Sequence, residues 1–196
     1  MTFEQWRSHA RAWLFHFFGR HERALGEYIR AFRLDPRHAP TARSIAFLAA
    51  QGKRHAEAEQ WYLEALRIEP EDADTHFNLG YVRQEMRHHE AAVAAFAAAV
   101  GLKPSLDRAW YGLGLAHAGL GDHGRAVAAL REAARLQPMN GHAYYQLGMA
   151  CHHDGRREEM EKVLRRLIGF DPKLARQLVR DSGRDDLAAL LPQIPF

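Results

Sequence analysis

Histidine and cysteine are the side chains in this sequence with the clearest capacity for chemistry. The chain holds 13 His and one Cys, and imidazole and thiolate groups are common ligands of transition metals. Two ligands on one helical face must stand three or four residues apart, and no two histidines have that spacing. The adjacent pairs, such as His152 and His153, diverge by about 100° around a helix. The histidines alone therefore predict no metal site.

One short cluster is an exception to this spacing argument. Cys151-His152-His153-Asp154 gathers four possible ligands where a helix is expected to end, and a bent backbone could bring two of them together. The alternative is that Cys151 fills a buried position of the core. We favour the core interpretation, and we expect neither a metal nor a cofactor.

Motifs that assemble a catalytic site are absent from the sequence. There is no Gly-rich phosphate loop, no Gly-x-Ser-x-Gly turn and no His-Glu-x-x-His pair. We therefore expect no catalytic residues and predict that this chain is not an enzyme.

The composition is that of a folded chain, with 47% hydrophobic and 26% charged residues. The formal net charge is only +3, so no nucleic-acid partner is implied. No stretch approaches the roughly 20 apolar residues of a membrane span, and a signal peptide is not apparent at the start. We predict a cytoplasmic protein without an intrachain disulfide, since there is a single Cys.

Prolines recur along the chain at one constant interval. Each stands 34 residues after the last and closes a short tripeptide that begins with an apolar residue. Proline cannot continue a helix and keeps its predecessor out of helical angles. The spacing therefore predicts a recurring helical segment that ends before each proline. The five prolines are Pro36, Pro70, Pro104, Pro138 and Pro172.

Other residue types recur in the same register. A Leu-Gly pair returns in the last three repeats, as in Leu113-Gly114, and Ala92 and Ala99 flank Phe96 on a single helical face. Glycines in the middle of the repeats, such as Gly52, are expected to take left-handed angles that end a first helix. Each repeat is thus predicted to be a helix, a short turn, a second helix and a proline stop. The repeats are residues 5–38, 39–72, 73–106, 107–140 and 141–174.

The pattern resembles the tetratricopeptide repeat (TPR), with its opening Trp-x2-Leu-Gly and its later Ala-x3-Phe. Trp110-x2-Leu113-Gly114 matches the first element, and Ala92-x3-Phe96 matches the second. The resemblance implies an all-α fold, a right-handed superhelical solenoid of antiparallel helix pairs, as a single domain over residues 1–196. The tail, 175–196, is expected to cap the fifth repeat. The alternative is a detachable peptide that occupies a groove.

In the TPR family the first helix of each repeat lines the concave surface, so the resemblance places a partner there. Aromatic side chains dominate this face, and they offer large contact area at low entropic cost. The alternative is that these rings pack between helices and only stiffen the array. Arg43 and Arg108 are candidates for pairing with an acidic group of a partner. The expected groove residues are Trp13, Arg43, Phe47, Phe77, Asn78, Tyr81, Arg108, Tyr111, Tyr145 and Met149.

The function predicted from these features is that of an adaptor or scaffold which holds a peptide or helix of another protein. One alternative is a chaperone for an export or assembly substrate. Another is a self-associating scaffold, a homo-oligomer formed through the aromatic first helix, which carries Trp6, Trp13, Phe15, Phe17 and Phe18.

Overall fold

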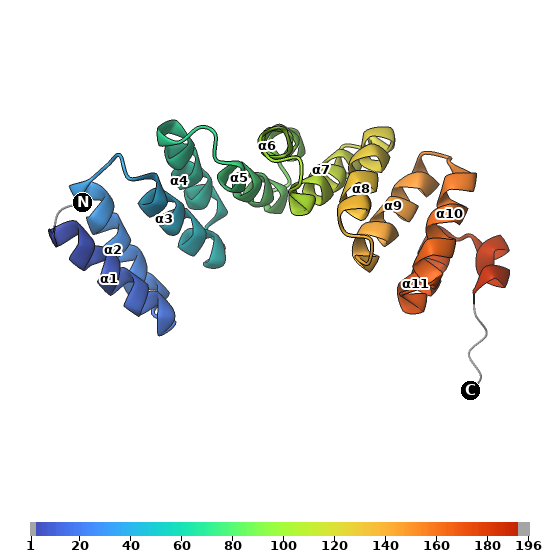
Figure 1. Cartoon of the computed structure of the whole chain (residues 1–196), viewed down its shortest axis with the longest axis horizontal. Coiled ribbons are helices and arrows are strands. Elements are labelled where there is room, and N and C mark those ends of the chain that lie inside the picture. Colours follow the sequence, from blue (N-terminus) through green and yellow to red (C-terminus); the bar gives the residue numbers. More distant parts are fainter. Residues whose placement is uncertain (1–2, 192–196) are drawn as a thin grey trace. The chain divides into compact units, whose positions relative to one another are not determined.

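A computed structural model of the chain describes residues 3–191, so the end of the expected tail, 192–196, lies outside the described residues. Over that range the chain is helical and shows no strand. None of its helices is long and apolar enough to cross a membrane. The helices (Figure 1) are α1 (Phe3–Phe17), α2 (His21–Leu34), α3 (Ala39–Gln51), α4 (His55–Ile68), α5 (Ala73–Glu85), α6 (His89–Leu102), α7 (Asp107–Gly119), α8 (His123–Leu136), α9 (Gly141–His153), α10 (Arg157–Ile168), α11 (Pro172–Ser182) and the 3-10 helix η1 (Asp185–Leu190).

The helices follow the predicted period. From α3 to α9, the first helix of each repeat begins 34 residues after the one before it, and the same holds for the second helices from α2 to α10. The helices of each repeat pair with one another, and each second helix also packs on the next first helix in α2–α3, α4–α5 and α8–α9. The prediction of an all-α array of tandem antiparallel helix pairs is confirmed.

The contacts between Cα atoms divide the chain into two compact units. The N-terminal unit, Met1–Leu102, contains α1 to α6, and the C-terminal unit, Lys103–Phe196, contains α7 to α11 and η1. The structure describes each unit by itself. That the five repeats form one domain stays a prediction.

Small residues hold each helix pair together. An ideal Cβ on Gly80 would lie 2.7 Å from Cδ1 of Phe96, and one on Gly114 would lie 2.5 Å from Cγ of Leu130. No real Cβ tolerates such distances, so these positions admit only glycine without repacking. The second helix in turn presents alanines that are fully buried, such as Ala92 and Ala126. The helices therefore approach closely because a large side chain of the second helix packs where the first helix has a glycine, with small alanines buried beside it.

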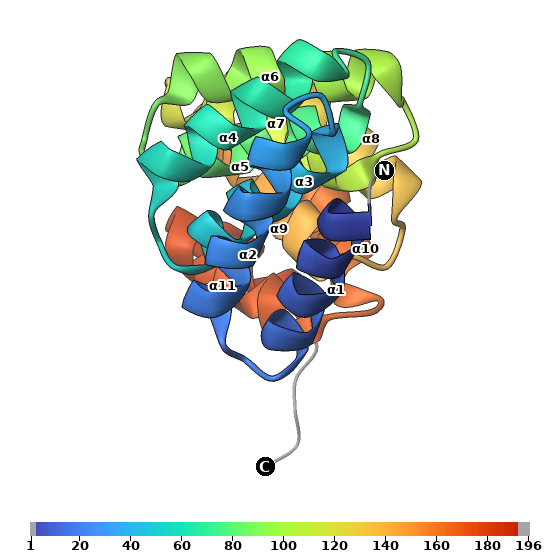
Figure 2. The same ribbon diagram turned by 90° about the vertical axis from the view of Figure 1, so that its left-hand side faces the viewer.

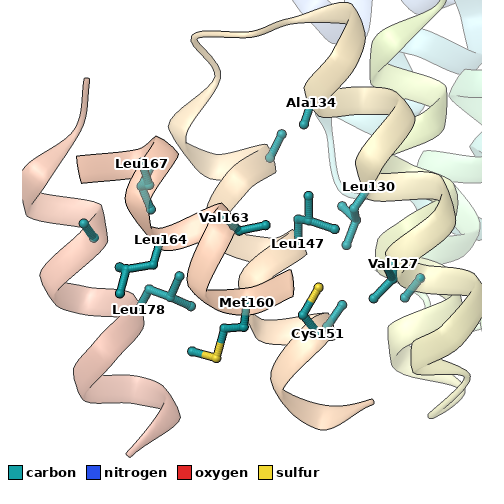
Figure 3. Packing of buried hydrophobic residues seen from close by; sticks show 14 of the residues in the cluster. Val127, Leu130, Ala134, Leu147, Cys151, Met160, Val163, Leu164, Leu167 and Leu178 are labelled. Carbon is teal, nitrogen blue, oxygen red and sulfur yellow. The ribbon is translucent and has the colours of Figure 1, made fainter. Parts of the chain in front are cut away.

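In the C-terminal unit, α8, α9, α10 and α11 share one hydrophobic core (Figure 3). Cys151 is fully buried within it, and burial raises the pKa of its thiol to about 12. The core interpretation of Cys151 is confirmed. Leu178 of α11 is also fully buried, and it packs against Gly148 of α9. The described part of the tail thus covers the fifth repeat.

A helix ends before each of the five prolines, as predicted, but the last proline also begins the next helix. Pro36, Pro70, Pro104 and Pro138 each stand two residues after the end of a helix, whereas Pro172 stands four residues after the end of α10 and is the first residue of α11. Asp171 precedes it as the N-cap, and its Oδ1 accepts a hydrogen bond from the backbone N–H of Leu174 at 3.1 Å. Proline is tolerated at this position because the first helical N–H groups have no partner within the helix. The same residue type therefore starts a helix here.

The turn within each repeat uses a left-handed residue at one fixed column. Gly52 was expected to fill this role in the second repeat, but its φ is −76°. The left-handed residue there is Lys53, with a φ of 58°, and in the third repeat it is Arg87, with a φ of 59°. The other repeats place glycine in this column, at Gly19, Gly121 and Gly155.

Replacing Lys53 and Arg87 with glycine should stabilise the protein, because a side chain at positive φ costs about 1–2 kcal/mol and glycine removes that cost. We expect each substitution to raise the free energy of unfolding by about 1 kcal/mol, measured by chemical denaturation. Gly52→Ala is the control and should have little effect, since Gly52 has ordinary angles. A loss of stability in Lys53→Gly would contradict this assignment.

The close approach at Gly80 can be tested by adding a single methyl group. Gly80→Ala should be less stable than Gly26→Ala by about 1–3 kcal/mol, the usual cost of overpacking. Both changes gain the same helix propensity, but an added Cβ at Gly26 in α2 would meet nothing within 4 Å. Equal unfolding midpoints for the two variants would show that the Phe96 side chain can move away from the added methyl group without a loss of stability.

Candidate functional site

The N-terminal unit carries a groove on the face formed by α1, α3 and α5. It consists of two adjoining pockets, of about 400 Å³ and about 330 Å³, which share Phe47, Tyr62 and Asn78 as lining residues. The first extends toward His16 of α1, and the second extends toward Phe77 and Tyr81 of α5. The two pockets together span three consecutive repeats.

The floor of the groove is formed by tyrosines of the second helices. Tyr28 of α2 and Tyr62 of α4 are buried, and both line the first pocket. Burial raises the pKa of Tyr62 to about 12, and it also raises the pKa of Tyr28, whose hydroxyl is hydrogen-bonded to Ser44. Both hydroxyls therefore stay neutral at physiological pH.

Sequence analysis did not include these two tyrosines among the expected groove residues, since they belong to the same column of the repeat as Phe96, a residue of the packed face of the second helix. The later members of that column, Phe96 and Leu130, have no hydroxyl. The sequence could have indicated a polar floor in the first two repeats, because only these two repeats have a tyrosine hydroxyl at this position.

Aromatic side chains of the first helices form the walls. Phe47 projects from α3 and Tyr81 from α5, and both are exposed. Phe77 is partly buried, with its ring centroid 6.0 Å from that of Phe96. Asn78 lines both pockets and offers an amide that can donate and accept hydrogen bonds. Five of the predicted residues thus meet in one groove: Arg43, Phe47, Phe77, Asn78 and Tyr81.

Arg43 also lines the groove, but its charge is already paired within the chain. Its Nη1 lies 2.6 Å from Oε2 of Glu69 and 2.9 Å from Oδ2 of Asp72. Asp72 accepts a second hydrogen bond, from the hydroxyl of Thr75 at 2.5 Å. Two carboxylates at the end of the same repeat therefore already compensate this guanidinium. That Arg43 pairs with an acidic group of a partner stays a prediction.

Trp13 of α1 is exposed, and its ring stacks on that of Phe17 with centroids 5.5 Å apart. It is not among the residues that line either pocket. His16 lines the groove at this end instead, with its ring 6.1 Å from that of Phe47. His16 was not among the groove residues expected from the sequence.

The remaining predicted residues belong to the C-terminal unit. Tyr111, Tyr145 and Met149 are partly buried and pack against its hydrophobic core. The hydroxyl of Tyr145 donates a hydrogen bond to Oδ2 of Asp181 in α11 at 2.7 Å. Arg108 is exposed on α7. Tyr145 is therefore engaged by the capping helix, which is a structural contact.

No group of three or more His, Cys, Asp or Glu side chains within residues 3–191 is arranged to hold a metal ion. His123 and His153 do come together, with stacked rings 4.9 Å apart. Burial lowers the pKa of His153, and the neighbouring His123 and His152 contribute to this shift.

A partly buried hydrogen-bonded chain joins α1 to α3. Nε2 of His9 lies 2.7 Å from the hydroxyl of Thr41, which lies 2.7 Å from Nδ1 of His38. Thr41 is fully buried. Burial, with a smaller effect of His38, lowers the pKa of His9 below its usual value of 6.5.

Comparison with known proteins identifies the repeat. A family profile described as "Tetratricopeptide repeat" matches residues 77–134 and 116–175, and one described as "TPR repeat" matches residues 49–86. No curated protein sequence matches the chain significantly.

Solved structures share the fold. The crystal structure of MamA has a TM-score of 0.82 at 18% identity, with 100% of both chains covered. The structure of YrrB, described as a TPR protein with an unusual peptide-binding site, has a TM-score of 0.78 at 23% identity and covers 88% of this chain and 90% of its own. A TPR protein from Parabacteroides merdae has a TM-score of 0.80 at 16% identity, with coverages of 95% and 77%. At these identities the likeness establishes the fold alone.

Protonation of His9 should destabilise the fold. Because its pKa is lowered in the folded state, the unfolded chain binds this proton more readily, and stability is lost as pH falls below 6.5 until it reaches the folded pKa. We expect the unfolding midpoint to fall between about pH 7.5 and about pH 5.5, and His9→Gln to reduce the slope. His117 and His153 also have lowered pKa values, so some slope should remain. An unchanged slope in His9→Gln would exclude His9 as a contributor.

Proposed function

Because the chain belongs to the tetratricopeptide repeat family, we propose that it acts as a protein-binding scaffold whose N-terminal groove holds an extended segment of a partner protein. The observation that carries the proposal is the pair of adjoining pockets on the first-helix face, joined at Phe47, Tyr62 and Asn78. A continuous groove across three repeats matches the shape of an extended peptide better than that of a compact ligand.

The lining residues indicate the chemistry of the bound segment. Exposed rings at Phe47 and Tyr81 offer apolar contact, and Asn78 can hydrogen-bond a peptide backbone. Arg43 is compensated by Glu69 and Asp72, so a strongly acidic segment gains no uncompensated cation from it. We therefore infer a partner segment with apolar or aromatic side chains and little net charge.

The likeness to YrrB supports peptide binding as the mode of recognition, since that protein is described as having a peptide-binding site. The same groove would serve a chaperone for an export or assembly substrate, because an apolar stretch of such a substrate presents the same chemistry. That the chain is cytoplasmic and not an enzyme stays a prediction.

A displayed library of random peptides, selected against the intact chain, tests the groove directly. We expect enriched peptides to carry apolar side chains, and Phe47→Ala to weaken their binding by about tenfold or more, as the loss of an aromatic anchor does. Isothermal titration calorimetry with synthetic copies of these peptides measures the change.

Met139→Ala is the matched control, because Met139 is an exposed apolar residue of the C-terminal unit outside this groove. Circular dichroism should show the same helix content in both variants. If peptides bind Phe47→Ala as tightly as the unaltered chain, the groove is not their binding site.

A further inference from the structure

The first helix exposes a regular stripe of large aromatic side chains. Phe3 is 71% exposed, Trp6 54%, Trp13 60% and Phe17 71%. With Ala10 between the two tryptophans, the stripe has spacings of three, four, three and four residues. This alternation is the heptad pattern that brings one face of a helix against another helix.

The aromatic residues of the stripe are ordered in pairs. The rings of Phe3 and Trp6 stack with centroids 6.1 Å apart, and those of Trp13 and Phe17 stack at 5.5 Å. An aromatic pair that is already packed loses little side-chain entropy when another surface covers it. Each end of the stripe is thus a preformed contact surface.

Leu14 lies beside the stripe and is exposed, whereas the residues at the same position of the next two first helices are buried. Leu14 of α1 is 46% exposed, whereas its counterparts 34 and 68 residues later, Leu48 and Val82, are 2% and 0% exposed. Leu48 and Val82 belong to first helices that are covered by the preceding second helix, since α2 packs on α3 and α4 packs on α5. Among the described residues, α1 and α2 form one edge of the N-terminal unit, with α3 next to them (Figure 1), and this edge faces the viewer in Figure 2.

We propose that this stripe is the contact surface of a homodimer, in which α1 packs antiparallel against α1 of a second copy. The order of residue types in the stripe, Phe, Trp, Ala, Trp, Phe, is the same in both directions. A two-fold axis through Ala10 places Phe3 against Phe17 of the second copy, because each lies seven residues from Ala10. It brings Trp6 beside Trp13 of the second copy with an offset of one residue, because they lie four and three residues from Ala10. An isologous interface requires this kind of self-complementarity.

The available area is sufficient for a dimer. Four aromatic side chains of about 150–250 Å² each, more than half exposed, offer roughly 500 Å² per copy. With Leu14 and Phe18 at the flank, the two copies together would bury about 1,200–1,400 Å², which reaches the range of stable interfaces.

Charge does not oppose the contact, since the charged residues of α1 beside the stripe are paired within the chain. Nη2 of Arg7 lies 2.7 Å from Glu4, and Nη2 of Arg11 lies 3.0 Å from Glu27. At the end of the fifth repeat, α11 covers the apolar surface with Leu178. If the fifth repeat of one copy packed on α1 of another, α11 would have to be displaced from the fifth repeat. A contact between two α1 helices leaves α11 in place.

Sedimentation equilibrium of the full chain from micromolar to millimolar concentration tests the proposal. We expect the mass to rise to twice 22.4 kDa, and Trp13→Glu to weaken association by about thirtyfold or more, as expected for a Trp at the centre of an interface. Met139→Glu, an equally exposed apolar position, should dimerise normally. Phe47→Ala should also remain dimeric, which separates this surface from the groove.

A cysteine at the two-fold axis tests the geometry without disturbing the aromatic residues. Ala10→Cys should form an intermolecular disulfide on mild oxidation, because the two residues would face each other, whereas Ala94→Cys on the exposed surface of α6 should not. The natural Cys151 is fully buried and should not react. A chain that stays monomeric at every concentration, or an Ala10→Cys variant that links no faster than Ala94→Cys, would overturn the antiparallel dimer.

Discussion

The close approach of the two helices within a repeat is the constraint on which the rest of the structure depends. At Gly80 and Gly114 the neighbouring side chain occupies the place of a Cβ, and fully buried alanines such as Ala92 and Ala126 line the second helix. Because the first helix has no side chain at these glycines, large residues of the second helix, such as Phe96 and Leu130, pack directly against it. Large side chains on the outer face of the first helices remain exposed, and they line the groove at Phe47 and form the stripe at Trp13.

The apolar surface is covered at one end of the described chain and exposed at the other. At the fifth repeat, α10 ends at Ile168, and Pro172 begins α11 at once, so that Leu178 fills the space beside Gly148. The hydroxyl of Tyr145 donates a hydrogen bond to Asp181 of α11. In α1, by contrast, no helix of the described residues covers Trp13 and Leu14, and both side chains remain exposed. This difference underlies the inference that α1 is an interface.

Charge is used mainly within the molecule. Arg43 joins its first helix to Glu69 and Asp72 of the loop that leads into the next repeat, and Arg83 of α5 pairs with Glu59 of α4 at 2.7 Å. Such pairs hold successive repeats in register, although each contributes little to stability where solvent reaches it. Apart from the compensated Arg43, the groove is therefore lined mainly by apolar, aromatic and amide groups, together with hydroxyls and the imidazole of His16, and this lining suits a segment with little net charge.

The sequence by itself determined the repeat length, the helix pairs and the small residues between them, because these follow from local rules: proline stops a helix, and residues three, four and seven positions apart share a face. It could not show that Arg43 is compensated, that Tyr62 forms the floor beneath Phe47, or that Lys53 rather than Gly52 takes left-handed angles. Tertiary structure decided these points. Each depends on which atoms of another helix or turn lie nearby, and a period along the chain holds no information on such distances.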